Sequence, residues 1–158
     1  MTQARILVVD DEPFNLDIVG EYLDEMDFDL VMVESGEAAW DALCDITQAF
    51  DLVLLDRMMP GMDGIMLLKR MKADERFASI PVIMQTAATS PEQIREGLAA
   101  GAFYYLTKPF EGEALQTIIR SALDDMRVRR ELTANLADHA HALACLGEGE
   151  FVVRSLDD

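Results

Sequence analysis

Five short apolar segments recur between residues 5 and 107, and most of them are continuous rather than alternating with polar residues. The segments are RILVV (5–9), DLVMV (29–33), DLVLL (51–55), IPVIMQ (80–85) and AFYYLT (102–107). Strands inside a parallel sheet are apolar along their whole length, because helices cover both faces of the sheet. The pattern therefore predicts five buried parallel strands.

The segments between these strands carry apolar residues at steps of three and four, which is the spacing of one helix face. Helices are expected at residues 13–26, 35–47, 63–74, from 90 onward and from 111 to about 127. Pro13 and Pro91 suit the first position of a helix. Ser90 and Gln93 match a capping box, in which the serine side chain bonds to the first helical turn and the glutamine side chain reaches back to the serine.

Strands that alternate with helices form a parallel sheet covered on both faces, and right-handed crossovers leave few topologies. We predict an α/β fold of the flavodoxin-like (βα)5 type, a doubly wound parallel sheet with strand order 2-1-3-4-5. In such sheets, ligands bind beyond the carboxyl ends of the strands, near the point where the strand order reverses. The functional site is expected at that edge.

The end of the chain has a different pattern, so we divide the chain into a domain at 1–127 and a helical extension or linker at 128–158. The extension carries a seam at alternating steps of four and three, formed by Leu132, Leu136, His139, Leu143 and Leu146. Such a seam fits either a helix packed on the domain or a contact between two copies. FVVRSL (151–156) resembles a strand without a neighbour, so the chain is expected to lead to an output domain beyond it or to pair elsewhere.

Acidic residues outnumber basic ones by 30 to 13, which gives a formal net charge of −17. Binding to nucleic acid is not expected, because it needs cationic side chains that meet phosphates. Binding to a membrane surface is not expected, because the sequence has no basic amphipathic helix face. No apolar segment is long enough to span a membrane. Cys44 and Cys145 are too few and too distant for a disulfide framework or a metal site. We expect a soluble cytoplasmic protein.

Four of the predicted strands end in residues that carry chemistry. Asp10 and Asp11 follow the first strand, Asp56 the third, Thr86 the fourth and Lys108 the fifth. Parallel strands end at one edge of the sheet, and the first and third strands are neighbours in the expected order. The three acids should therefore form one cluster, with the threonine and the lysine beside it.

Three carboxylates in one cluster repel one another, by about 4 kcal/mol for two unit charges roughly 4 Å apart at an effective dielectric constant of 20. A cation is required, and an all-oxygen ligand set without His or Cys favours Mg²⁺ over zinc. A carboxylate can also act as a nucleophile and hold a phosphoryl group. Mg²⁺, the Lys108 ammonium and the Thr86 hydroxyl would then neutralise the phosphoryl charge, which makes Asp56 the candidate nucleophile.

With these residues at its strand ends, the chain resembles a response-regulator receiver domain of two-component signalling, from the CheY-like superfamily. The matching stretches are ILVVDDE (6–12), DLVLLDRMMPGMDG (51–64), PVIMQTA (81–87) and GAFYYLTKPF (101–110). They occur in the family's order and at its intervals, and the likeness covers about residues 5–125.

The resemblance implies how the phosphorylation site would be built. Asp56 would be the phosphoacceptor, which receives phosphate from the phosphohistidine of a histidine kinase or phosphotransfer protein. Asp10 and Asp11 would bind Mg²⁺ together with Asp56 and the backbone carbonyl of Met58. Lys108 would bond to the phosphoryl group. The protein would be a switch rather than an enzyme, assisting only its own phosphorylation and dephosphorylation.

The resemblance also implies how the switch would work. Thr86 would turn toward the phosphoryl group, Tyr105 would change between an exposed and a buried position, and the Lys108–Pro109 bond would be cis. The surface of the fourth helix, fifth strand and fifth helix would then change. That surface would bind a downstream protein, a fused output domain or a second copy of the chain, and the C-terminal helix is the other candidate dimer contact.

Other classes of protein fit less well. A haloacid dehalogenase-type phosphatase also uses a nucleophilic aspartate after a strand, but it places a second acid two residues later, where this chain has Met58. The P-loop sequence GxxxxGK[ST] is absent. The alternative that remains is a receiver-like interaction or dimerisation module that works without phosphorylation.

Overall fold

The computed structural model describes residues 3–87 and 90–145, with side chains up to residue 136. The strands are β1 (Arg5–Val9), β2 (Asp29–Val33), β3 (Leu52–Asp56), β4 (Val82–Thr86) and β5 (Tyr104–Thr107). The helices are α1 (Pro13–Tyr22), α2 (Gly36–Cys44), α3 (Gly64–Lys72), α4 (Pro91–Ala99) and α5 (Gly112–Cys145). Strands and helices alternate along the chain, as the apolar pattern predicted.

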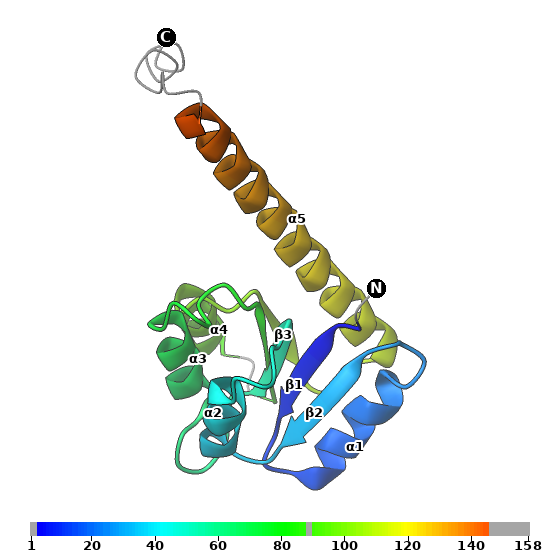
Figure 1. The fold of residues 1–158 in the computed structure, drawn as a ribbon. Helices are drawn as coiled ribbons and strands as arrows, with labels where there is room; N and C mark the ends of the chain where they lie inside the picture. The colour runs from blue at the N-terminus through cyan, green and yellow to red at the C-terminus, as the bar shows by residue number, and fades with distance from the viewer. Residues whose placement is uncertain (1–2, 88–89, 146–158) are drawn as a thin grey trace. The chain divides into compact units, whose positions relative to one another are not determined.

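All neighbouring strands are parallel, and the sheet order is β2-β1-β3-β4-β5 (Figure 1). The flavodoxin-like prediction is therefore confirmed. The register pairs Asp56 with Gln85 and Thr86 with Thr107, so the ends of β3, β4 and β5 lie at the same edge. The order reverses beside β1 and β3, which is where the fold offers a ligand site.

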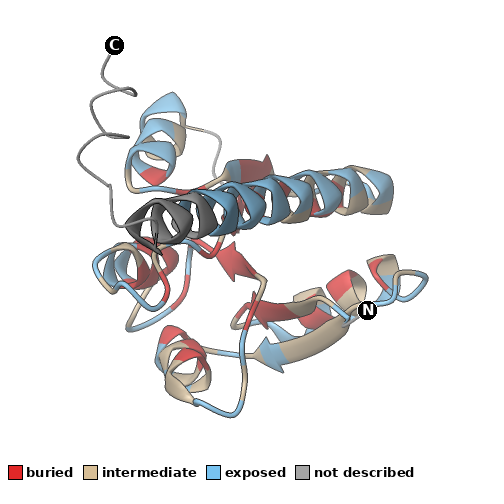
Figure 2. Cartoon of the chain, turned by 45° about the horizontal axis from the view of Figure 1, so that its top comes forward, coloured by how far each residue is buried: buried red, intermediate tan, exposed pale blue. Residues whose placement is uncertain are grey.

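Two apolar clusters lie on opposite faces of the sheet. One joins alternate strand residues such as Val53 and Met84 to α2 and α3, and the other joins residues such as Leu54 and Ile83 to α1 and the first part of α5. Figure 2 shows buried residues concentrated in the inner strands, whereas the edge strand β2 is mostly half-buried. Burial on both faces explains why the inner strands read as continuous apolar segments.

The starts of two helices follow the sequence prediction closely. Ser35 Oγ accepts a hydrogen bond from the backbone N–H of Ala38 at 3.0 Å, and Asp63 Oδ1 accepts one from Met66 at 2.9 Å. These side chains satisfy backbone donors that have no partner inside the helix. Both residues are therefore N-caps, and their helices begin one residue later.

Two local predictions are wrong. Helix α1 ends at Tyr22 rather than residue 26, and its last turn carries no basic side chain that would favour the negative end of the helix dipole. Helix α4 begins at Pro91 as expected, but the Ser90 side chain makes no capping hydrogen bond. The expected capping box is thus absent, and the Gln93 Oε1 atom is buried without a hydrogen-bond partner in the described part of the chain.

The chain divides into two compact units, Met1–Leu123 and Asp124–Asp158, and α5 continues through the boundary as a helix of 34 residues. The prediction placed a helical extension after residue 127, and the structure confirms helix there as a direct continuation of α5 to Cys145. Within residues 3–87 and 90–145, no helix combines the length and apolar character needed to cross a membrane.

The predicted seam is described only in part. Leu132 and Leu136 are exposed, with fractions of 56% and 70%. The side chains of the remaining seam residues and the predicted strand at 151–156 lie outside the described residues. The division at 127 and the role of the extension therefore stay predictions.

Candidate functional site

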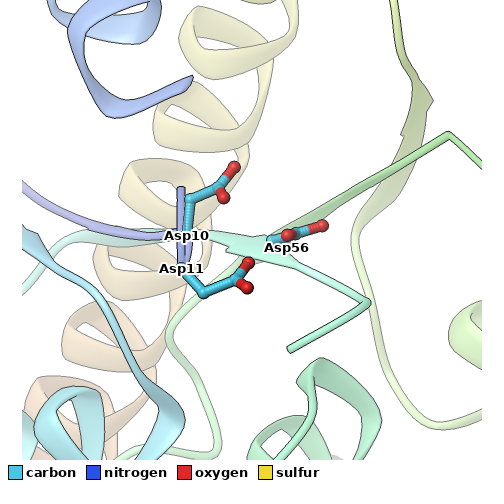
Figure 3. A group of neighbouring side chains, drawn as sticks. All are labelled: Asp10, Asp11 and Asp56. Atoms are coloured by element: carbon cyan, nitrogen blue, oxygen red, sulfur yellow. The ribbon is translucent and has the colours of Figure 1, made fainter. Parts of the chain in front are cut away.

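The acidic cluster lies at the carboxyl edge of the sheet. Asp10 and Asp11 follow β1, and Asp56 is the last residue of β3 (Figure 3). One carboxylate oxygen from each of the three residues lies within 4.8 Å of the other two. Asp10 and Asp56 are buried, and Asp11 is half-buried. The donor set consists of oxygen atoms alone, so the three acids fit a small hard cation such as Mg²⁺.

Lys108 brings a positive charge to the cluster from the end of β5. Its Nζ atom donates to Asp10 Oδ2 at 3.0 Å and lies 3.6 Å from Asp56 Oδ1. The other oxygen of Asp10, Oδ1, accepts the backbone N–H of Glu12 at 3.0 Å. These two contacts fix the Asp10 carboxylate at the start of α1. The Lys108–Pro109 peptide bond is cis, as the resemblance implied.

The Asp56 carboxyl has a pKa raised from its ordinary value of 3.8 to about 6. Burial is the main cause, because it disfavours the charged form, and the negative charge of Asp10 raises the pKa further. The Lys108 ammonium and a hydrogen bond from the Met58 backbone N–H act in the opposite direction. One ammonium thus compensates only part of the burial and repulsion, and a divalent cation would supply the missing positive charge.

Two glycines shape the loop after Asp56. Gly61 has a φ of +73°, which side chains rarely tolerate, and it lets the loop turn before α3. The backbone N–H of Gly64 donates to the Arg57 carbonyl at 3.0 Å, so the loop returns to the end of β3. The space around Gly64 is filled by the backbone of Asp56 and Arg57.

The expected switch residues lie on β4 and β5. Thr86 is fully buried at the end of β4, and its carbonyl accepts the backbone N–H of Lys108 at 2.7 Å. Tyr105 is 8% exposed, and its hydroxyl is buried without a hydrogen-bond partner among the described residues. Its ring occupies the space beside Gly97 of α4. The Tyr105 ring is therefore buried against α4 in this structure.

Two residues around the site were missed by the sequence prediction. Arg57 is buried, and its guanidinium reaches α4, where it pairs with Glu96 at 3.0 Å. Gln85 is 1% exposed, and its Nε2 atom has no hydrogen-bond partner in the part of the chain that the structure describes. A polar residue inside an apolar strand could have identified Gln85. The pairing of Arg57 depends on where α4 packs, and the local sequence carries no signal for it.

A cavity of about 260 Å³ adjoins the cluster between α1 and the segment after β5. It is lined mainly by apolar side chains from Ile18, Val19, Tyr22, Pro109 and Phe110, with Asn15, Gln85, Ala87 and Lys108 completing the wall. Lys108 therefore borders both the cavity and the acidic cluster.

The fold and this edge define a receiver-type α/β domain, with an acidic cluster and a lysine at the carboxyl ends of a five-stranded parallel sheet. The family model described as "Response regulator receiver domain" matches residues 6–120. The chain belongs to this family, which confirms the resemblance.

Curated relatives agree with the family. The DNA-binding dual master transcriptional regulator RpaA of Synechocystis is 38% identical over 119 residues, which are 75% of this chain and 48% of RpaA. The sensor protein GacS of Pseudomonas syringae is 38% identical over 118 residues, 73% of this chain but 13% of GacS. The transcriptional regulatory protein FixJ of Bradyrhizobium diazoefficiens is 33% identical over 149 residues, 94% of this chain and 71% of FixJ. The matched part thus spans about half of RpaA and a small part of GacS.

Solved structures agree as well. A CheY-like response regulator receiver domain from Methanospirillum hungatei has a TM-score of 0.74 and 26% identity, with 81% of this chain and 99% of that chain covered. The chemotaxis protein CheY4 of Vibrio cholerae has a TM-score of 0.69 and 31% identity, with 77% of this chain and 100% of that chain covered. The likeness covers most of this chain and nearly all of each receiver domain.

Proposed function

We propose that this chain is a phosphorylation-controlled switch in which Asp56 accepts a phosphoryl group from a histidine kinase or phosphotransfer protein. One observation carries the proposal: Asp56 is a buried acid whose carboxylate lies beside two further acids and 3.6 Å from the Lys108 ammonium. Burying three acids side by side lowers the stability of the fold, because their charges lose water and repel one another. A site that must hold a cation and a phosphoryl group needs this arrangement.

The reaction is a phosphoryl transfer between two side chains. An oxygen of the Asp56 carboxylate attacks the phosphorus of a phosphohistidine, the P–N bond breaks, and the released imidazole nitrogen takes up a proton. Lys108 already points at this carboxylate, so its ammonium would bond to the new phosphoryl oxygens. Asp10, Asp11, Asp56 and the backbone carbonyl of Met58 would hold Mg²⁺, which would neutralise charge on the transferred group.

The phosphoryl group would act on the rest of the domain through β4 and β5. It adds up to about −2 charge and three acceptor oxygens at the edge of the sheet. The Thr86 hydroxyl would turn toward it, and the Tyr105 ring would repack beside α4. The surface of α4, β5 and the first part of α5 would then favour a different partner, which is enough to shift a population between two states.

The partners follow from this mechanism. A downstream protein or a fused output domain would read the changed surface, and a homodimer would form through that surface or through the C-terminal part of α5. RpaA is named as a DNA-binding regulator, but the charge of −17 indicates that this chain does not itself bind nucleic acid. We place the protein in the cytoplasm as a switch without an enzymatic activity on other substrates.

The direct test is incubation of the full chain with Mg²⁺ and acetyl phosphate, followed by mass spectrometry of the intact protein. Wild type should gain one phosphoryl group as acetate leaves, and Asp56→Asn should gain none. Asp24→Asn, which changes an exposed acid, is the matched control and should be labelled like wild type. A wild type that stays unlabelled by acetyl phosphate and by phosphorylated kinases would favour the interaction module that works without phosphorylation.

A further inference from the structure

Arg57 follows Asp56 directly, and its backbone is held on both sides. Its N–H donates to the Gln85 carbonyl at 2.9 Å, and its carbonyl accepts the N–H of Gly64 at 3.0 Å. These bonds tie Arg57 to β4 and to the start of α3. The side chain is 10% exposed, which is rare for an arginine unless its charge is paired. The position of Arg57 is thus fixed by the same loop that carries Asp56.

The guanidinium of Arg57 extends to α4 and makes two contacts there. Nη1 donates to the Gln93 carbonyl at 3.3 Å, and Nη2 donates to Glu96 Oε1 at 3.0 Å. The Glu96 side chain is 51% exposed, so water weakens this ion pair on one side. The planar guanidinium nevertheless binds two groups of one helix at once, which fixes the helix better than a single contact would.

Helix α4 has few other attachments to the domain. Gly97 is its buried residue, and a side chain at this position would overlap the Tyr105 ring. Ile94 is only partly buried, and Ser90 provides no side-chain cap. Little apolar surface of α4 is buried, so the two bonds from Arg57 contribute to holding this helix in place.

Two buried polar atoms, one on α4 and one on β5, lack a hydrogen-bond partner among the described residues. They are Gln93 Oε1 and the hydroxyl oxygen of Tyr105. Each such group costs free energy, and a displacement of α4 that gave it a partner would recover that cost. The two unpaired atoms therefore oppose the observed position of α4, and the bonds from Arg57 favour it.

We propose that Arg57 is a positioning residue that holds α4 against Tyr105 and transmits the state of the Asp56 loop to this helix. The transmission rests on the function proposed above, whereas the holding of α4 does not. Because Asp56 and Arg57 are consecutive, a shift of the loop on phosphorylation moves the root of the arginine side chain. The guanidinium then loses its alignment with Gln93 and Glu96, and α4 is released.

The first experiment tests the holding of α4 in the unphosphorylated full chain by amide hydrogen exchange. Glu96→Ala removes the acceptor for Arg57, and Glu92→Ala removes an exposed acid from the first turn of the same helix as a matched control. Exchange of the amides in α4 should become about three- to tenfold faster in Glu96→Ala than in Glu92→Ala, as expected for loss of a half-exposed charged hydrogen bond. Equal exchange in the two variants would overturn the proposal.

Variants of Arg57 separate a positioning role from general stability. Arg57→Met should release α4 at least as much as Glu96→Ala, because it removes the bond to the Gln93 carbonyl as well as the pair with Glu96. Adding Glu96→Ala to Arg57→Met should change little further, because its partner is already gone. Arg57→Lys keeps the charge but not the planar group, so it should restore only part of the protection. Faster exchange throughout the domain would indicate a structural role alone and would contradict the proposal.

The second experiment tests transmission with Mg²⁺ and acetyl phosphate, observed by NMR of ¹⁵N-labelled protein. Phosphorylation of wild type should shift the amides of α4. In Arg57→Met these amides should lie near the shifted positions before phosphorylation and should move little afterwards, although the mass gain at Asp56 is unchanged. A full α4 response in the variant would refute transmission, whereas a wild type without mass gain would refute the proposed function and leave the exchange result standing.

Discussion

Gly64, the first residue of α3, lies directly against the backbone of Asp56. A Cβ atom at position 64 would overlap the Asp56 carbonyl oxygen and would lie 2.8 Å from the Cα atom of Arg57. Both neighbours are backbone atoms at the end of β3, so neither can move aside as a flexible side chain could. The start of α3 is thus packed onto the strand end that presents Asp56.

We predict that Gly64→Ala lowers the free energy of unfolding by about 2 kcal/mol or more, because the overlap must be relieved by moving α3 or β3. Gly20→Ala is the control inside α1, where the added Cβ meets only the end of the Met32 side chain at 3.2 Å. Helix propensity favours alanine there, so this variant should range from neutral to about 1 kcal/mol more stable. Urea unfolding measures both, and equal effects would contradict the packing argument.

The raised pKa of Asp56 predicts how stability depends on pH. Because the folded-state pKa of about 6 exceeds the ordinary 3.8, the folded protein binds this proton more tightly than the unfolded chain. The resulting stabilisation is complete below pH 3.8 and is lost as the pH rises through 6. At pH 8, without Mg²⁺, the charged carboxylate lowers the free energy of unfolding by up to about 3 kcal/mol.

Asp56→Asn should therefore be more stable than wild type at pH 8, by up to about 3 kcal/mol, and the difference should shrink toward pH 5. Denaturant unfolding at both pH values, with a chelator present, measures it. Asp24→Asn controls for a change in net charge at an exposed position and should change the free energy of unfolding only slightly. An Asp56→Asn difference that stays constant between pH 5 and pH 8 would show that the carboxyl pKa is not raised.

The sheet and its edge could be predicted because their signals are local. Continuous apolar segments identify parallel strands, and alternation with helices leaves few topologies, so the order of strands brings Asp10 and Asp56 to one edge. Charge repulsion between acids gathered at one edge then indicates a cation. The position of Lys108 follows from the fifth strand in the same way.

The contacts around α4 could not be predicted because they depend on how a lightly buried helix packs. Ser90 and Gln93 have the sequence of a capping box, yet neither side chain caps the helix. Arg57 appears in the sequence as one more polar residue of a loop, and its pairing with Glu96 exists only once α4 is placed. The helical extension after residue 127, in contrast, could be predicted from the spacing of its apolar seam, and the structure continues α5 through it to Cys145.

Gln85 leads to a prediction about the core. Its Nε2 atom is buried without a hydrogen-bond partner in the described residues, and its neighbours on this face of the sheet are mainly apolar. Burying an unsatisfied amide costs about 1–3 kcal/mol. Gln85→Leu, which replaces the amide by an apolar side chain, should therefore raise the free energy of unfolding by about that amount.

Thermal and urea unfolding of Gln85→Leu measure this gain. Gln3→Leu replaces an exposed glutamine whose amide bonds to Asp27, and it should bring no gain. A destabilised Gln85→Leu would mean that the amide has a favourable partner in solution.

The acidic cluster predicts that Mg²⁺ stabilises the fold. A cation that binds the folded chain alone raises the free energy of unfolding by about 1 kcal/mol when its concentration is roughly five times its Kd. The effect should be weaker in Asp11→Asn, because one of the three carboxylates is lost. It should also be weaker at pH 5 than at pH 8, because protonated Asp56 is a poor ligand. Unfolding in MgCl₂ and in NaCl of equal ionic strength separates binding from screening of the net charge. Equal stabilisation by both salts would remove the case for a magnesium site formed by Asp10, Asp11 and Asp56.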